Sequence, residues 1–181
     1  MYQKTLKKML TPSRLYHSYC VSDQAQHLAK IFGANEKKAK IAGLLHDITK
    51  SLPTDKQLKI INEAGFKLDE IQRVSPKLLH SISGAIYIKK FLDIKDDEII
   101  SAIRYHTTAK PKMTLLEKIV YLADYTSLDR KFVDAAYMRE IVEKSLDDGM
   151  KYGLTYTIRD LIDKSVAIHP DTFLAYNYYI K

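Results

Sequence analysis

A histidine and an aspartate stand side by side at positions 46 and 47, where a strongly helical run over residues 36–45 ends. The pair follows Leu44 and Leu45, so an apolar helix face would carry it partly into the interior, where ionisable groups need partners. Further imidazoles and one further carboxylate recur in or beside other apolar-periodic segments, at His17, His80, His106 and Asp124. Four imidazoles and two carboxylates can hold two hard or borderline metal ions. The sequence therefore predicts a metal-dependent hydrolase.

The ligand types restrict the metal. Cys20 is the only cysteine, so a site built from thiolates is excluded, and nitrogen and oxygen ligands favour iron, manganese, cobalt or zinc. Neighbouring side chains on a helix diverge by about 100°. His46 can therefore take one ion while Asp47, with two oxygens, bridges both. Two ions held in this way lower the pKa of a shared water and generate a nucleophile at neutral pH.

Helices are the elements that must position these residues. Apolar spacing predicts them near 13–32, from 36 to the His46-Asp47 pair, over 54–64 and 69–74, from 80 to 91, from 97 to 106, from 115 past Asp124, and over about 133–152 and 157–168. Asn35 is a predicted N-cap, as is either Asp96 or Asp97, and Thr54 with Gln57 and Thr114 with Glu117 have the form of capping boxes. The expected fold is all-α.

We expect one domain over residues 1–181, because 181 residues with 46% apolar and 28% charged residues suit a single globular unit. Its metal-site core would span about 14–130, with the C-terminal helices over about 133–168 packing on it. No apolar run approaches the ~20 residues that span a bilayer, and the N-terminal segment lacks the features of a secretion signal. The expectation is a cytoplasmic protein without a membrane partner.

The net charge of +7 indicates an anionic partner. The lysines are scattered along the predicted helices and do not form a basic arm, so a polyphosphate substrate is favoured over nucleic acid. The sequence leaves a monomer and a homodimer open.

Four short sequence motifs contain the candidate ligands other than His17: residues 42–50 (AGLLHDITK), 79–85 (LHSISGA), 102–108 (AIRYHTT) and 121–125 (YLADY). With His17 before them, their order resembles the HD-domain metal-dependent phosphohydrolases, and more narrowly the YqeK family of symmetrical diadenosine tetraphosphate hydrolases. The resemblance runs from about Arg14 to Arg130 and continues more weakly through His169.

This resemblance implies a helical HD fold with two metal ions, with iron as the native metal. One ion would be held by His17, His46, Asp47 and Asp124, and the other by His80, His106 and the shared Asp47. The implied reaction is attack by a metal-bound hydroxide on diadenosine tetraphosphate, which yields two ADP.

Positive side chains would stabilise charge on the transferred phosphoryl group. Lys50 and Arg130 are the candidates for a catalytic role beside Asp47, and Arg14, Arg104 and Thr107 are further candidates for substrate binding.

The sequence departs from the family pattern at residues 126–128. The family usually continues after Asp124-Tyr with an isoleucine, a glutamate and often a proline, whereas this chain has Thr126, Ser127 and Leu128. Such a change would affect specificity and leave metal binding intact.

Two alternative functions remain. An HD-domain phosphohydrolase could act on another nucleotide, such as a cyclic dinucleotide, a guanosine polyphosphate or a deoxynucleoside triphosphate. The second alternative is a helical regulatory or nucleic-acid-binding protein. The six inward-facing ligands argue against it, because binding alone would not require them.

Outside the candidate site, His27 is expected to be partly exposed, and His169 is expected to cap or pack against a C-terminal turn.

Overall fold

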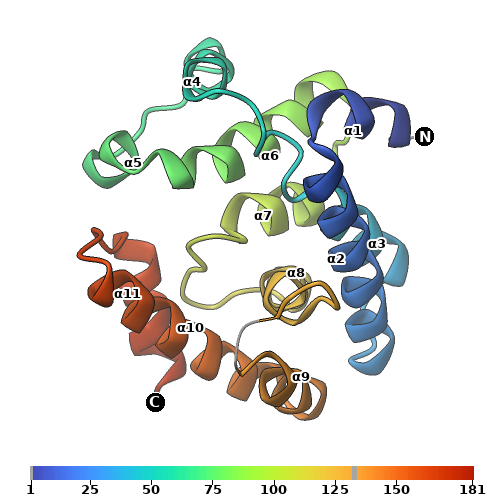
Figure 1. Ribbon diagram of the computed structural model, residues 1–181, viewed down its shortest axis with the longest axis vertical. Helices are drawn as coiled ribbons and strands as arrows, with labels where there is room; N and C mark the ends of the chain where they lie inside the picture. Colours follow the sequence, from blue (N-terminus) through green and yellow to red (C-terminus); the bar gives the residue numbers. More distant parts are fainter. Residues whose placement is uncertain (1, 132–133) are drawn as a thin grey trace.

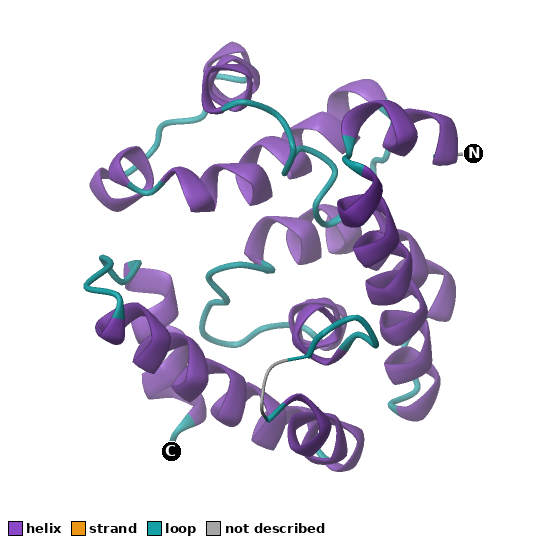
Figure 2. Cartoon of the chain, viewed as in Figure 1, coloured by secondary structure: helices purple, strands orange, loops and turns teal. Residues whose placement is uncertain are grey.

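The computed structural model describes residues 2–131 and 134–181, and every regular element in these ranges is a helix (Figure 2). The prediction of an all-α fold is confirmed. In the same two ranges, no helix combines the length and the apolar character needed to cross a bilayer.

Short loops connect the helices, and the chain begins and ends near helical segments (Figure 1). The elements are α1 (Gln3–Met9), α2 (Pro12–Ile31), α3 (Glu36–Leu45), α4 (Thr54–Glu63), α5 (Glu70–Val74), the 3-10 helix η1 (Pro76–Leu78), α6 (Leu79–Phe91), α7 (Asp97–Tyr105), α8 (Leu115–Thr126), α9 (Ala135–Lys144), α10 (Leu146–Asp163) and α11 (Pro170–Tyr179).

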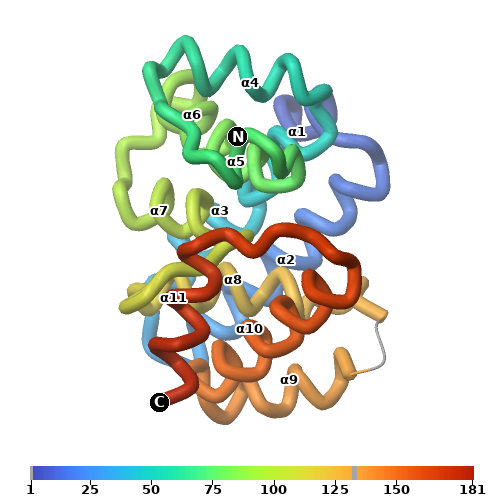
Figure 3. Tube along the Cα trace, turned by 90° about the vertical axis from the view of Figure 1, so that its left-hand side faces the viewer, coloured from blue at the N-terminus to red at the C-terminus, as the bar shows by residue number. Residues whose placement is uncertain are grey.

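Helix α8 lies at the centre of the fold and is seen end-on in Figure 1. It packs against α2, α3, α7, α9 and α10, and its residues 119–123 are all buried. Helices α4, α5 and α6 lie on one side of this centre and α9, α10 and α11 on the other, as Figures 1 and 3 both show. The main apolar core extends from Leu6 in α1 to Ala175 in α11, so the C-terminal helices share it with the N-terminal ones.

Several helix ends follow the predicted capping chemistry. The side chain of Asn35 accepts a hydrogen bond from the Lys38 amide, and Asp96 caps α7 in the same way. Thr114 and Glu117 form the predicted capping box of α8. Helix α2 ends just before Gly33, whose φ of 69° is a left-handed conformation that glycine adopts without strain.

Helix α3 approaches α2 unusually closely at Gly43. A Cβ atom at this position would lie 2.9 Å from the carbonyl oxygen of Val21 and 3.0 Å from the Cα of Ser22. Only glycine fits without a shift of one helix against the other. This contact brings the end of α3, where His46 and Asp47 lie, against the helix that carries His17.

The predicted capping box of Thr54 and Gln57 is wrong. Helix α4 does begin at Thr54, but its N-cap is Pro53 and no side chain caps it. The Gln57 side chain instead donates a hydrogen bond to the carbonyl oxygen of Leu52, at 2.8 Å. The Gln57 side chain is therefore held by the loop before α4 and does not accept the N-cap amide hydrogen bond that a capping box requires.

The predicted helix boundaries in the C-terminal third are also wrong. The helix expected over 133–152 is interrupted at Ser145, which is extended and accepts a hydrogen bond from the Asp148 amide as the N-cap of α10; residue 133 lies outside the described residues. Val142, Leu146 and Met150 are all buried at four-residue steps, so the apolar spacing continues across the break and hides it. The segment expected to be helical over 157–168 belongs to α10 only as far as Asp163.

Candidate metal centre

The structure brings together all six side chains predicted to bind metal. His17 lies in α2, His46 and Asp47 follow the last residue of α3, and His80 lies at the start of α6. His106 is the C-cap of α7, and Asp124 lies in the last turn of α8. The four histidines and Asp47 are at most 4% exposed, and Asp124 is partly buried.

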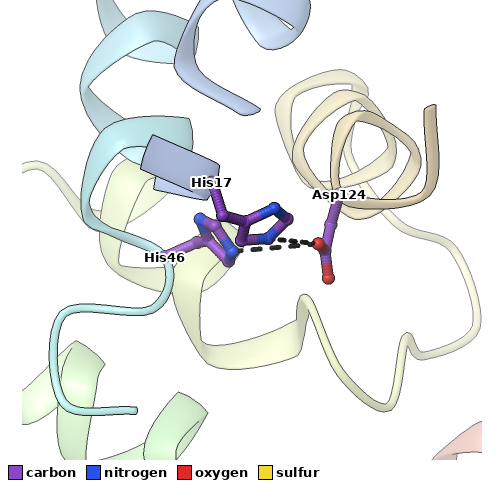
Figure 4. Close-up of side chains that lie close together, drawn as sticks. All are labelled: His17, His46 and Asp124. Carbon is purple, nitrogen blue, oxygen red and sulfur yellow. Dashed lines mark ion pairs between the residues drawn. The ribbon is translucent and has the colours of Figure 1, made fainter. Parts of the chain in front are cut away.

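His17, His46 and Asp124 form one group. Figure 4 shows their side chains converging from three separate segments of the chain. The Oδ1 atom of Asp124 lies 2.9 Å from the Nε2 atom of His17 and 3.9 Å from that of His46. Ligand atoms of all three residues lie within 4.8 Å of one another, close enough to share one ion.

Asp47 joins this group to the other two histidines. Its Oδ2 atom lies 3.5 Å from the Nε2 atom of His46, whereas its Oδ1 atom lies 3.1 Å from His80 Nε2 and 3.6 Å from His106 Nε2. The two carboxylate oxygens of Asp47 thus face different histidines. His46, Asp47 and His106 also meet the geometric requirement for a shared ion.

Backbone carbonyl groups orient two of the imidazole rings. The Nδ1 atoms of His46 and His106 lie 2.7 Å from the carbonyl oxygens of Gly43 and Ile103, respectively. Because a carbonyl oxygen only accepts, each Nδ1 must carry the proton, and in a neutral ring the lone pair is then on Nε2. Both Nε2 atoms point into the cluster, ready to bind a cation.

The cluster contains buried nitrogen atoms that no protein group satisfies. The Nε2 atoms of His17 and His46 are buried and have no hydrogen-bond partner. The 2.9 Å approach of His17 Nε2 to Asp124 lacks the geometry of a hydrogen bond, although both groups are close enough for an ion pair. Two buried acceptors facing each other at this distance are unfavourable unless a cation lies with them. The imidazole nitrogens and carboxylate oxygens of the cluster, together with these two unsatisfied Nε2 atoms, fit a divalent metal ion bound through nitrogen and oxygen.

Asp129 contacts the centre and was missed by the sequence analysis. Its Oδ2 atom accepts a hydrogen bond from Nδ1 of His17 at 2.7 Å, which directs Nε2 of that ring to Asp124. Carboxylates commonly orient metal-binding histidines in this way. The available signal was an acidic residue five positions after Asp124, directly after the stretch that departs from the family pattern.

Arg139 in α9 holds the backbone that carries Asp129. Its guanidinium donates to the carbonyl oxygens of Thr126, Ser127 and Arg130 at 2.8–3.0 Å. Within this stretch Thr126 and Ser127 are buried, whereas Leu128 is 77% exposed. The departure from the family pattern therefore begins at the last residue of α8 and continues into a loop that is fixed through its backbone.

The electrostatic environment keeps the carboxylates ionised. Burial alone would raise the pKa of Asp47, but the charge of His46 and the close approach of the His80 and His106 rings hold that pKa well below its usual value. Burial alone would also raise the pKa of Asp124, but the close approach of the His17 ring and the charge of Arg130 hold that pKa well below its usual value. Burial lowers the pKa of His80 to about 4, so this imidazole is neutral at pH 7. Ionised carboxylates and neutral imidazoles are the forms that bind metal.

Three predicted cationic side chains lie at the cluster. The Nζ atom of Lys50 lies 3.2 Å from both ring nitrogens of His80. Arg14 Nη1 lies 2.9 Å from Asp47 Oδ2, and Arg130 donates through Nε to the carbonyl oxygen of Asp124 and through Nη2 to its carboxylate. About a third of each arginine side chain remains exposed. These cations surround the carboxylates and still reach solvent.

Arg104 and Thr107 lie farther from the ligand atoms. The guanidinium of Arg104 packs over the rings of Phe66 and Tyr105, 5.5 and 5.1 Å from their centroids. Thr107 donates a hydrogen bond to Ser81 Oγ at 3.0 Å, next to His80 in α6. The structure thus places Thr107 beside the centre and Arg104 in an adjacent aromatic cluster.

The remaining histidines have separate environments. His27 is half exposed and lies 3.1 Å from Glu143. His169 is buried and caps α11, and its Nε2 atom lies 2.8 Å from Asp69 Oδ2. His169 therefore links the start of α11 to the loop before α5 and does not join the six-residue cluster.

Comparison with known proteins agrees with this geometry. The HD domain family model matches residues 14–129. The chain is 35% identical to the "Bis(5'-nucleosyl)-tetraphosphatase, symmetrical" of Bacillus subtilis over 97% of this chain and 94% of that protein. It is 36% identical to the protein of the same description from Halalkalibacterium halodurans, over 95% of this chain and 91% of that one.

A solved structure shares the fold along almost the whole chain. It is a protein from Clostridium acetobutylicum described as a "predicted HD superfamily hydrolase involved in NAD metabolism", with 37% identity and a TM-score of 0.95. The superposition covers 98% of this chain and 94% of that protein. From the family match, the full-length relatives and the shared fold, the chain belongs to the HD-domain family, and within it to the group of the symmetrical bis(5'-nucleosyl)-tetraphosphatases.

Proposed function

We propose that this protein hydrolyses diadenosine tetraphosphate symmetrically and releases two molecules of ADP. The observation that carries the proposal is the cluster of six candidate metal ligands, in which the Nε2 atoms of His17 and His46 are buried without a hydrogen-bond partner. The full-length similarity to two relatives described as symmetrical tetraphosphatases supports the substrate class. A net charge of +7 suits a polyphosphate substrate.

The proposed centre holds two metal ions. One would bind His17, His46, Asp47 and Asp124, and the other would bind His80, His106 and the second oxygen of Asp47. We propose iron as the native metal, with manganese, cobalt and zinc as alternatives that the same nitrogen and oxygen ligands accept. When bound, the ions supply Lewis acidity and a hydroxide nucleophile at neutral pH.

The chain's own residues position and neutralise the substrate. Arg14 and Arg130 each use only part of their guanidinium on Asp47 and Asp124, and the remaining N–H groups can donate to phosphate oxygens. Lys50 adds a positive charge beside His80. Asp47, Lys50 and Arg130 are the proposed catalytic residues, and Thr107 and Arg104 are proposed substrate contacts on the α7 side.

Product analysis tests the proposal. The purified, metal-loaded protein is incubated with diadenosine tetraphosphate, a cyclic dinucleotide, a guanosine polyphosphate, a deoxynucleoside triphosphate and NAD, and the products are separated by chromatography. NAD is included because the Clostridium relative is described as involved in NAD metabolism. ADP as the only product from diadenosine tetraphosphate is the expected result. ATP with AMP would contradict the symmetrical cut, and turnover of only another nucleotide would support the alternative HD-domain activity.

A further inference from the structure

An open pocket of about 340 Å³ adjoins the candidate metal centre between the end of α8 and one face of α10. The two helices are in contact and lie side by side in Figures 1 and 3. Its lining includes Asp124, Tyr125 and Arg130 at and just after the end of α8, and Tyr156, Leu161 and Lys164 in and just after α10. Because Asp124 and Arg130 belong to both, the pocket is continuous with the metal centre.

Two tyrosine rings form a corner in this pocket. The rings of Tyr125 and Tyr156 are 6.4 Å apart and nearly perpendicular, with an interplanar angle of 81°. Tyr125 is held by a contact of 2.7 Å between its hydroxyl and Thr157 Oγ1, and by the ring of Tyr121 at 5.3 Å. One wall of the corner is therefore fixed before any ligand arrives. A planar heterocycle can stack on one ring while its edge meets the other.

The mouth of the pocket carries both charge signs. Tyr156, Asp160 and Lys164 follow one another at four-residue steps, so they lie along one face of the chain at the end of α10. Asp160 and Lys164 form an ion pair at this face. The pocket thus combines the Arg130 guanidinium next to the metal centre, two aromatic rings and a polar ion pair, which are groups that can contact the phosphates, the base and the polar edge of a nucleotide.

We propose that this pocket binds the nucleoside of one ADP half of the substrate, with the base against Tyr125 and Tyr156 and the phosphates directed to Arg130. The inference rests on the proposed function and deepens it by assigning a base-recognition site. Stacking on aromatic side chains contributes to nucleotide binding for every base, since each base has a π-face. Arg130 can donate to a phosphate through N–H groups that Asp124 does not use.

A second aromatic pocket near the centre is less suited to a base. It is lined by Phe66, Ile82, Arg104 and Tyr105, among others. The Arg104 guanidinium already lies over the rings of Phe66 and Tyr105, and the Nζ atom of Lys110 lies 4.9 Å from the Tyr105 centroid. A base would have to displace these cations to reach either ring.

Calorimetric binding of two ligands to the metal-loaded protein tests the assignment. ADP and pyrophosphate carry the same two phosphates, but only ADP carries a nucleoside. The wild-type protein should bind ADP more tightly than pyrophosphate. Tyr156→Ala should weaken ADP binding about tenfold, the scale of losing one stacked ring, and should leave pyrophosphate binding unchanged. Tyr156→Phe, which keeps the ring, should restore ADP binding.

Tyr137→Ala is the matched control, because Tyr137 is a 57% exposed tyrosine in α9 that does not line this pocket. It should change neither affinity. Equal binding of ADP by the wild-type protein and Tyr156→Ala would overturn the proposal, even if diadenosine tetraphosphate is hydrolysed as expected. Conversely, selective loss of ADP binding in a protein that does not hydrolyse this substrate would keep the nucleoside pocket and reject the proposed function.

Photolabelling of the wild-type protein with 8-azido-ADP does not depend on the folding of any variant. Peptide mapping should place the label on the pocket segments that contain Tyr125 or residues 156–164. Label concentrated instead on the segments with Phe66 and Tyr105, or spread over the surface, would overturn the assignment.

Discussion

The Nδ1 atom of His17 lies 2.7 Å from the Oδ2 atom of Asp129, although the two residues are 112 positions apart in the chain. This contact fixes which nitrogen of His17 faces Asp124, and it connects the metal centre to the loop after α8. We therefore expect Asp129 to act as a positioning residue.

Asp129→Asn should weaken metal binding about 10- to 100-fold, the range found when a residue that orients a metal ligand is replaced. Titration of the metal-free protein with manganese or zinc, followed by calorimetry, measures this affinity. Asp23→Asn is the control, because Asp23 is exposed on the same helix as His17. Unchanged affinity in Asp129→Asn would show that His17 keeps its orientation without this carboxylate.

Asp47→Ala should lose nearly all bound metal, because the two oxygens of Asp47 face different histidines. Turnover should fall about a thousandfold or more, since both ions would lose a ligand and their charge stabilisation. Elemental analysis of the purified variant measures the metal content. Asp23→Ala controls for the loss of a carboxylate, and full metal content in Asp47→Ala would refute the bridging assignment.

Lys50→Ala should retain metal but lower kcat about a hundredfold, because the partly buried cation beside His80, proposed to stabilise charge on the phosphoryl group, would be lost. Steady-state kinetics and elemental analysis on the same preparation separate the two effects. Lys59→Ala removes a lysine that is 70% exposed on α4 and should leave kcat unchanged. A normal kcat in Lys50→Ala would exclude a catalytic role for this lysine.

Gly43→Ala should destabilise the fold by about 1–3 kcal/mol, because the new Cβ would lie within 3.0 Å of the backbone of α2 and force the two helices apart. Urea unfolding measures the change in free energy. Gly84→Ala is the matched control in α6, where a Cβ would meet its nearest neighbour at an ordinary 3.5 Å. That variant should be neutral or up to about 1 kcal/mol more stable, as alanine favours the helix.

His80 should make the stability of the metal-free protein depend on pH. Burial lowers its pKa from the ordinary 6.5 to about 4 in the folded state. Between these values the unfolded chain binds the proton more readily, so the contribution of His80 is complete above pH 6.5 and is lost as the pH falls toward 4. The loss should approach about 3 kcal/mol.

Urea unfolding of chelator-treated protein at several pH values tests this dependence. His80→Gln should show a shallower decline in unfolding free energy between pH 6.5 and pH 4 than the wild-type protein. His27→Gln replaces a half-exposed histidine on α2 and controls for the substitution itself. Parallel declines in the wild-type protein and His80→Gln would contradict the low pKa.

The helical fold and the meeting of the six predicted ligands followed from local patterns. Asn35, Asp96 and Thr114 cap the helices that lead to His46, His106 and Asp124, so each cap is encoded a few residues from the element it starts. Asp129 was not predictable in this way. Its position depends on three backbone contacts from Arg139, which lies in another helix and has no local signal.

The break at Ser145 was missed for a different reason. Buried apolar residues keep helical spacing on both sides of it, so periodicity alone describes α9 and α10 as one helix. The capping hydrogen bond of Ser145 distinguishes them, and a serine with two aspartates at the second and third positions after it was the signal that the apolar pattern outweighed.

The position of α8 has a consequence for motion. This helix is enclosed by five others and carries Asp124 and Tyr125 as consecutive residues, one at the metal centre and one in the adjoining pocket. A buried central element cannot shift without disrupting the packing of its neighbours, so the reacting centre and the pocket keep a constant separation. We therefore expect any movement that admits the proposed dinucleoside substrate to occur in the peripheral helices. Helix α8 would keep the distance between the metal centre and the nucleoside pocket fixed during that movement.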